Sequence, residues 1–273
     1  MIRRLRALWH QYAMLCRIEW AVLFAYRSES LIWMVGSFAQ PLVSLSVWLS
    51  ITGSGTLAGY NAKDYIVYFL GVLLVDRLTR SWDVWELEND IRQGTLSAKL
   101  MRPLHPVHWS IAQNVVYKTF FALLLIPSWA VLAWIWPVFR LETASIGMLM
   151  AAILSIFGAG ALRFLIGYEF GLLAFWTNRA SAMFALYEGI HLFLAGRIAP
   201  LSMFPEAIAR LAEWLPFYVT VGFPVDLLTG KLAGHPELIR QGFAGQLIWI
   251  VILAAVFGWE WKQGLRKYSS AGG

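Results

Sequence analysis

Long apolar segments separated by short polar breaks constrain this chain more than any other feature. A helix needs about 20 predominantly apolar residues to cross a hydrocarbon core of ~30 Å, and six segments come near or exceed that length. Only 14% of the 273 residues are charged, whereas soluble domains carry about 25%. We therefore predict an all-α polytopic membrane protein, with residues 1–273 forming a single transmembrane domain. The predicted spans are 31–52, 63–82, 110–136, 144–176, 181–199 and 240–261.

The stretch 77–109 lies between the second and third spans and is the longest run rich in charge. Each central Asp, Lys or Arg would cost about 2.5–3.5 kcal/mol in the middle of a bilayer, so we expect this stretch to face water. Two pairs at a spacing of four residues, Glu86 with Asp90 and Glu88 with Arg92, indicate that part of it forms a charged helix.

The charged helix is predicted over residues 81–92, and stop signals follow it. Gly94 is placed to end it, because glycine is common just beyond a helix C-terminus. Thr95 can start a second short helix, and Pro103 and Pro106 stiffen the return to the membrane. The stretch therefore reads as a compact helical projection between two spans.

Two other segments are apolar without being spans. Residues 4–26 place apolar side chains at helical spacing with most basic residues elsewhere, which predicts an amphipathic N-terminal helix. It either lies in the membrane interface or packs on its own protein, and both can hold together. Residues 200–238 are broken by prolines into pieces too short to cross, which predicts re-entrant external helices over 200–230. The prolines are Pro200, Pro205, Pro216 and Pro224.

The distribution of basic residues orients the spans. Of the 22 lysines and arginines, Arg163 is left out of the count because it lies deep within the fourth predicted span. Six spans place both termini on one side, and fifteen of the remaining basic residues fall on that side against six on the other. The positive-inside rule then puts both termini and the stretch 77–109 in the cytoplasm. The six opposite residues are Lys63, Arg140, Arg197, Arg210, Lys231 and Arg240.

Searches for catalytic and metal-binding patterns are negative. The sequence has no G-x-x-x-x-G-K-[ST] loop, so we expect no ATP hydrolysis and no bound cofactor in this chain itself. His105 and His108 have a ligand-like spacing but no third ligand nearby, so we expect no metal. The net charge of +6 lies mostly beside apolar spans, which favours membrane lipid over nucleic acid as its partner.

Two charges lie deep within the fourth predicted span, Arg163 and Glu169. Ionisable groups at such depth are candidates for a transport pathway, although each can equally pair with another helix. Between them, Gly167 and Gly171 form a small-xxx-small pattern suited to close helix packing, within the chain or between subunits.

Two stretches resemble the type-two ATP-binding-cassette (ABC) transporter permeases. The first is Glu88–Ser97 (ENDIRQGTLS), followed by Leu100–Pro106 (LMRPLHP); it is similar to the segment between the second and third spans of that family. The second is Gly196–Pro205 (GRIAPLSMFP), with LPF and FP further on; it is similar to the proline-marked external segment between the fifth and sixth spans.

The resemblance implies a permease subunit, not itself an enzyme, of an exporter in the plasma (bacterial inner) membrane. Its implied partners are two P-loop ATPase subunits, which would bind ATP and Mg²⁺, and a second permease subunit, identical or paralogous. The implied ATPase-coupling residues are Glu86, Glu88, Asp90, Arg92, Gly94, Thr95, Leu96, Arg102 and Pro103. The implied external gate comprises Pro200, Phe204, Pro205, Pro216, Phe217 and Pro224.

Two other functions stay open at this point. One is an ATP-independent secondary transporter or channel that uses Arg163 and Glu169 in an ion path. The other is an anchoring subunit without a pathway. The substrate is not indicated by any motif, although the lack of a dense polar cluster in the spans is compatible with amphipathic cargo.

Overall fold

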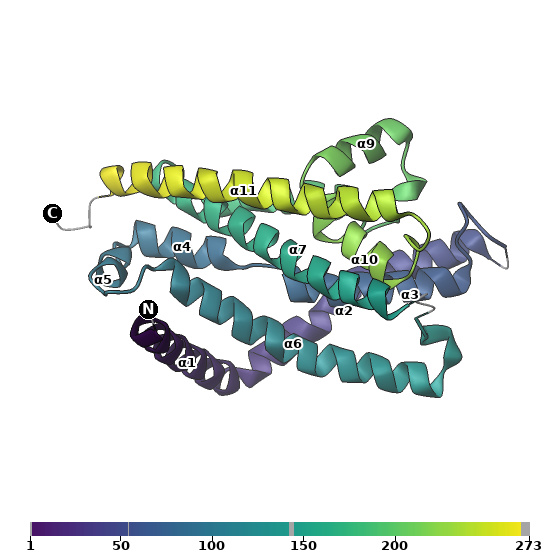
Figure 1. Ribbon diagram of the computed structural model, residues 1–273, viewed down its shortest axis with the longest axis horizontal. Coiled ribbons are helices and arrows are strands. Elements are labelled where there is room, and N and C mark those ends of the chain that lie inside the picture. Colours follow the sequence, from purple (N-terminus) through teal and green to yellow (C-terminus); the bar gives the residue numbers. More distant parts are fainter. Residues whose placement is uncertain (1, 54, 142–144, 269–273) are drawn as a thin grey trace.

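The computed structural model describes residues 2–53, 55–141 and 145–268, with side chains from residue 9 onward, and this part of the chain is helical throughout (Figure 1). No strand occurs in it beyond one isolated bridge between Leu57 and Tyr60. The α-helices are α1 (Ile2–Ala25), α2 (Arg27–Thr52), α3 (Ala62–Thr79), α4 (Asp83–Arg92), α5 (Leu96–Leu100), α6 (Val107–Ile135), α7 (Ile146–Leu172), α8 (Ala180–Leu194), α9 (Glu206–Trp214), α10 (Gly222–Leu228) and α11 (Pro236–Lys267). Short 3₁₀ helices are η1 (Pro137–Phe139), η2 (Leu173–Phe175), η3 (Leu201–Met203) and η4 (Tyr218–Thr220).

Four helices are long and apolar enough to cross a bilayer: α2, α6, α7 together with η2, and α11. They coincide with the first, third, fourth and sixth predicted spans. Their large apolar side chains also point outward, as at Val35, Phe157 and Val251. Such a surface would be unfavourable in water and is favourable against lipid, so the chain is a multi-pass membrane protein.

The second predicted span corresponds to α3, most of whose residues are buried. It begins with a capping box in which Asn61 and Asp64 bond each other's backbone, satisfying donors that a helix start leaves free. Tyr65 and Val72 are fully buried, and most of the helix lies against α2, α6, α7 and α10. Because α3 is covered on nearly all sides, it can carry charged residues that a lipid-facing span could not.

The fifth predicted span, 181–199, is wrong in extent. Helix α8 has 15 residues, about 22 Å at 1.5 Å per residue, which is shorter than the hydrocarbon core. It ends at Leu194, and Gly196, in the left-handed region at φ +80°, turns the chain. The apolar run continues past this turn, and that is why hydropathy alone overestimates the helix.

Helix α1 packs along α6 and is apolar on its outer face as well (Figure 1). Leu15 and Leu23 are buried, while Met14, Ile18 and Val22 are exposed at a spacing of four residues. The expectation that the N-terminal helix packs on its own protein is therefore confirmed, whereas its position in the membrane interface stays a prediction. The side chains of residues 1–8 are not among those described, so the predicted placement of the basic residues there stays a prediction.

Both described ends of the chain lie at the end of the molecule that carries α4 and α5 (Figure 1). The helices α9 and α10 lie toward the other end, as does the turn after α2. The segment 200–230 consists of short helices and turns, as its prolines predict. Residues 142–144, the last two before the predicted fourth span and the first of that span, lie outside the described residues.

Candidate functional site

The projection between α3 and α6 has the predicted helical form. Helix α4 ends at Arg92, and Gly94 follows with φ +77°, a conformation that favours glycine. Thr95 precedes α5 as predicted, but its hydroxyl donates back to Asp90 Oδ1 at 2.8 Å rather than capping α5. This bond closes the turn between α4 and α5.

The Glu86–Asp90 pair does not stabilise α4 as the spacing argument implies, because both side chains are acidic and repel one another. The repulsion is offset by Lys99 of α5, whose Nζ lies 2.9 Å from Glu86 Oε1 and also pairs with Asp90. Burial opposes the charged form of Lys99, but these two acidic partners outweigh it, so its pKa is raised. The ion pairs fix α5 against α4.

The inner face of this projection is apolar and buried. Leu96 is completely buried among Leu87, Ile91 and residues of α7. The N–H of Ser97 donates to the hydroxyl of Tyr268 at 3.1 Å, which ties α5 to the end of α11. The outer residues of the implied coupling set behave differently: Arg102 is exposed, and its guanidinium lies 5.0 Å from the ring centre of Trp109. Pro103 lies in the exposed turn beside it.

The expectation that the whole stretch 77–109 faces water is wrong for several of its charges. Arg77, Asp83 and Glu88 are all buried. Glu88 Oε2 accepts a 2.7 Å hydrogen bond from the backbone N–H of Ser181, in the first turn of α8. The start of α8 has no side-chain cap from neighbouring residues. The carboxylate of Glu88 on α4 instead accepts from a free backbone N–H there, at the positive end of the α8 dipole.

Asp83, at the start of α4, is held by two neighbours. Its carboxylate accepts from the hydroxyl of Ser81 and from Asn114 Nδ2 of α6, the latter at 2.9 and 3.1 Å. Burial raises the pKa of Asp83 to about 6, while both hydrogen bonds act in the opposite direction. Through Asp83 and Glu88, α4 contacts α6 and α8 at once.

The glycine pattern in α7 packs against α4 of the same chain. A β-carbon at Gly171 would lie 3.0 Å from Leu87 Cβ and 3.2 Å from the backbone of Val84. One at Gly167 would lie 2.9 Å from Ser81 Oγ. The close packing predicted for this pattern is thus within the chain, and α4 occupies the surface that a second subunit would need.

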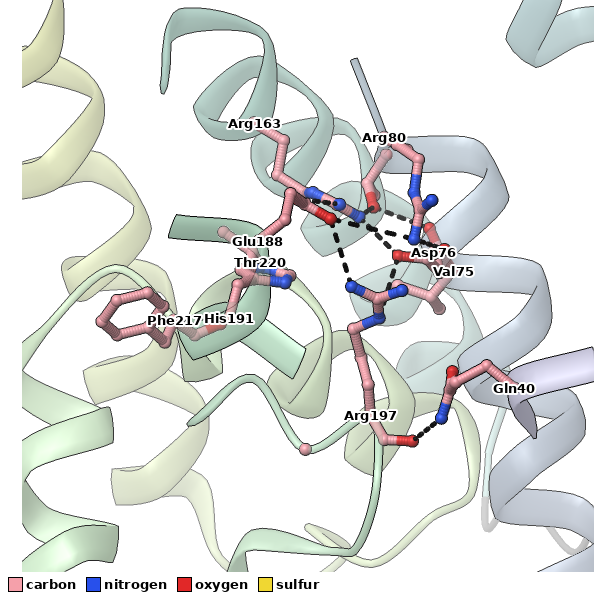
Figure 2. A network of polar contacts seen from close by, with 12 residues as sticks. Gln40, Val75, Asp76, Arg80, Arg163, Glu188, His191, Arg197, Phe217 and Thr220 are labelled. Atoms are coloured by element: carbon pink, nitrogen blue, oxygen red, sulfur yellow. Dashed lines mark hydrogen bonds and ion pairs between the residues drawn. The ribbon is translucent and has the colours of Figure 1, made fainter. Parts of the chain in front are cut away.

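Above the projection, five side chains form a buried ion network (Figure 2). Arg163 of α7 lies 2.8 Å from Asp76 of α3 and 3.1 Å from Glu188 of α8. Arg197 approaches the same two carboxylates at 3.4 and 3.3 Å. Arg80, at the end of α3, lies 2.9 Å from Asp76 and 3.9 Å from Glu188. The network joins α3, α7, α8 and the turn after α8.

The network gives Arg197 a role that the charge count made from the sequence did not consider. Its buried guanidinium points to Asp76 rather than to the surface, and its carbonyl accepts from Gln40 of α2 at 2.9 Å (Figure 2). A charge at this depth is costly unless it is paired, and the two carboxylates supply the pairing. Sequence reasoning missed Asp76 and Glu188, although an acidic residue inside an apolar run is a usable signal.

Arg163 and Glu169 do not share a site. Arg163 faces the network, whereas the charged neighbour of Glu169 is Glu260 of α11. Within the described residues, Glu169 Oε1 and Glu260 Oε2 are buried without a hydrogen-bond partner. The geometry therefore does not bring together the two residues on which an ion path was based.

Helix α8 also contacts the segment 200–230. His191 Nε2 lies 2.9 Å from the hydroxyl of Thr220 in η4, and Phe217 stacks on Tyr187 with ring centres 5.6 Å apart. Phe217 is thus a buried packing residue, and Pro224 is buried within α10. Pro200, ahead of η3, is buried as well. The other implied gate residues lie nearer the surface: Phe204 and Pro205 at the start of α9, and Pro216 before η4.

His105 and His108 are occupied by aromatic contacts. His105 lies 4.4 Å from Trp261 between ring centres, and His108 bonds the hydroxyl of Tyr12. In the described ranges, no three His, Cys, Asp or Glu side chains are grouped so that they could hold a metal ion.

The chain is thus a helical membrane protein with a polar helical projection at one end, anchored by buried acidic residues to its long helices. Residues 31–272 match the family described as ABC-2 family transporter protein, so the match covers most of the chain. The chain belongs to this family and is a membrane subunit of an ABC transporter; the family implies an ATP-binding partner subunit. A search of curated proteins gave no significant match.

Proposed function

We propose that this permease couples ATP hydrolysis in a partner to export across a bacterial inner membrane, with α4 and α5 as the docking element. The observation that carries the proposal is the 2.7 Å bond from the Ser181 N–H to Glu88. It attaches the docking element to the end of a short helix that also bears Glu188 and His191. A displacement of α4 would therefore act on α8.

From α8 the displacement would reach two places. Glu188 belongs to the ion network, so a shift of α8 changes its distances to arginines on α3 and α7. His191 and Tyr187 contact η4, in the segment that we propose as the external gate. Rigid helices joined by discrete polar contacts transmit rigid-body movement between two arrangements, as this mechanism requires.

The partners follow from the same arrangement. Two P-loop ATPases would bind ATP and Mg²⁺ and contact α4 and α5 from the cytoplasm, where we also place both termini. A second permease, identical or paralogous, would cover the outer face of α8. Four large apolar side chains lie exposed there at helical spacing, namely Met183, Leu186, Ile190 and Phe193. Membrane lipid would contact the remaining apolar faces.

The test uses the permease purified with its ATPase in nanodiscs, with ATPase activity as the readout. Glu88→Leu removes both the charge and the acceptor for Ser181, so we expect at least tenfold less permease-dependent ATPase activity with co-purification retained. Glu88→Gln keeps an acceptor oxygen and should lose less. Glu206→Gln is the matched control, because this exposed glutamate pairs only within α9.

Wild-type activity in Glu88→Leu would refute coupling through α8. Transport that persists without any ATPase and is abolished by ionophores would instead support the secondary transporter. No contact among the described residues favours that function.

A further inference from the structure

A cavity lined in part by polar side chains lies at the end of the molecule opposite to α4 and α5 (Figure 1). It has a volume of about 340 Å³ and lies between the turn before α3, helix α9, η4, α10 and the turn after α10. Neither the coupling residues nor the ion network contribute to it. The side chains that matter for its chemistry are Tyr60, Glu213, Tyr218, Asp226 and Lys231.

The cavity has more acidic than basic groups. Glu213 enters from α9 and Asp226 from α10. Asp226 Oδ2 accepts from the hydroxyl of Tyr218 at 2.7 Å. Among the described residues, no cation lies within ion-pair distance of either carboxylate, and the cation that acts on Asp226 from farther away is Lys231. Glu213 is exposed, whereas Asp226 is half-buried without a direct ion pair, so a cation bound beside Asp226 would stabilise its charged form.

The basic side chain that lines the cavity, Lys231, already has two partners. Lys231 Nζ lies 3.7 Å from Asp64, which is outside the cavity lining, and 4.1 Å from the ring centre of Tyr60. An ammonium on an aromatic face is a cation–π contact. Lys231 therefore demonstrates that the Tyr60 face accepts a cation, and it occupies that face when nothing else does.

We propose that this cavity binds the head group of an organic cation, a substituted ammonium of about the size of choline. Its charge would lie between Asp226, Glu213 and the ring of Tyr60, and Lys231 would move aside toward Asp64. An aromatic face together with carboxylates is the combination that recognises substituted ammonium groups, and the volume is in the range of small-ligand sites. The binding needs no ATPase, so it stands or falls separately from the coupling proposed above.

Helix α9 is placed to cover the cavity. It is joined to the rest mainly through α8 and η4, and it projects from the bundle (Figure 1). Its other faces carry exposed Leu211 and Trp214, which suit the membrane interface, where a cationic lipid head group or a free amine would both be accessible.

The experiment measures choline binding to the purified full-length protein in nanodiscs by calorimetry. The matched neutral ligand is 3,3-dimethyl-1-butanol, which has the shape of choline without the charge. We expect saturable choline binding and at least tenfold weaker binding of the neutral alcohol. Comparison of choline with short-chain phosphatidylcholine then separates a free amine from a lipid source: tighter binding of the lipid assigns the site to lipid head groups.

Variants assign the binding to the cavity. Asp226→Asn and Glu213→Gln should each weaken choline binding about tenfold, whereas Glu206→Gln on the outer side of α9 should leave it within twofold. Lys231→Gln should strengthen binding, because it vacates the Tyr60 face; a merely structural role for Lys231 would weaken it. Thermal unfolding without ligand checks that each variant is folded. Absence of choline binding, equal binding of the neutral alcohol, or insensitivity to Asp226→Asn would each overturn the proposal.

Discussion

At the residue scale, the most consequential feature is the sharing of two carboxylates by three arginines. Asp76 and Glu188 are each within ion-pair distance of Arg80, Arg163 and Arg197. Removing one partner from a buried ion network costs more stability than the complete network contributes, because the remaining charges stay buried without enough partners. Since three arginines share only two carboxylates, we expect the network to be most sensitive to the loss of a carboxylate.

We predict that Glu188→Gln lowers stability by about 3–5 kcal/mol, since it leaves three guanidinium groups with one carboxylate. Removing one arginine as well, in Glu188→Gln with Arg163→Met, restores the original excess of one positive charge and should recover part of the loss. Thermal unfolding in detergent measures both. A double variant as unstable as the sum of its single changes would contradict a shared network.

Asp83 gives a prediction for pH. Burial raises its pKa in the folded chain to about 6 from the ordinary value of 3.8, so between these values the folded state binds a proton that the unfolded state has released. The stabilising contribution is complete below about pH 4 and lost as pH rises through 6. At about 1.4 kcal/mol per tenfold change in proton affinity, the loss is roughly 3 kcal/mol.

The measurement compares wild type with Asp83→Asn by thermal unfolding from pH 4 to 8. As pH rises from 4 to about 6, the wild type should lose stability relative to Asp83→Asn. Above about pH 6 the difference in stability should stay constant. A pH-independent difference would mean that Asp83 keeps its ordinary proton affinity when folded.

At the scale of elements, the glycine face of α7 decides how closely α4 can approach. Backbone lies only 3.2 Å from a β-carbon at Gly171, so Gly171→Val must push α4 away or strain α7. We expect a loss of about 1–3 kcal/mol and reduced ATPase stimulation. Gly189→Ala on α8 is the control, because its β-carbon would meet nothing within 4 Å. Equal behaviour of the two variants would show that the α4–α7 contact is dispensable.

Helix ends were predictable where a local signal exists and not elsewhere. Gly94 is such a signal, and α4 ends just before it, as the sequence predicts. The Asn61–Asp64 box at the start of α3 is also a local signal, because both residues lie within one turn of the chain. The end of α8 has no comparable signal in its apolar run, because Gly196 is one of 22 glycines and only its tertiary contacts give it meaning. One of these contacts is a 2.7 Å bond from the Tyr68 hydroxyl to its carbonyl.

At the scale of the whole molecule, the orientation in the membrane remains a prediction that labelling can test. With Cys16, the only cysteine, replaced by serine, Gln93→Cys in the exposed turn after α4 should react with an impermeant maleimide only in inverted vesicles. Ala207→Cys on exposed α9 should react in intact cells. Labelling of both from the same side would refute the proposed topology.

The sequence by itself determined the class of fold, the polar projection and the family, because each depends on local composition or on contiguous motifs. It could not determine which buried charges meet. Arg163 lies 25 residues from Glu188 and 87 from Asp76 along the chain, so their pairing is set only when α3, α7 and α8 pack. The same holds for Glu88 of α4, which caps the start of α8. Its charge is evident in the sequence, but only the tertiary structure brings it to the end of another helix.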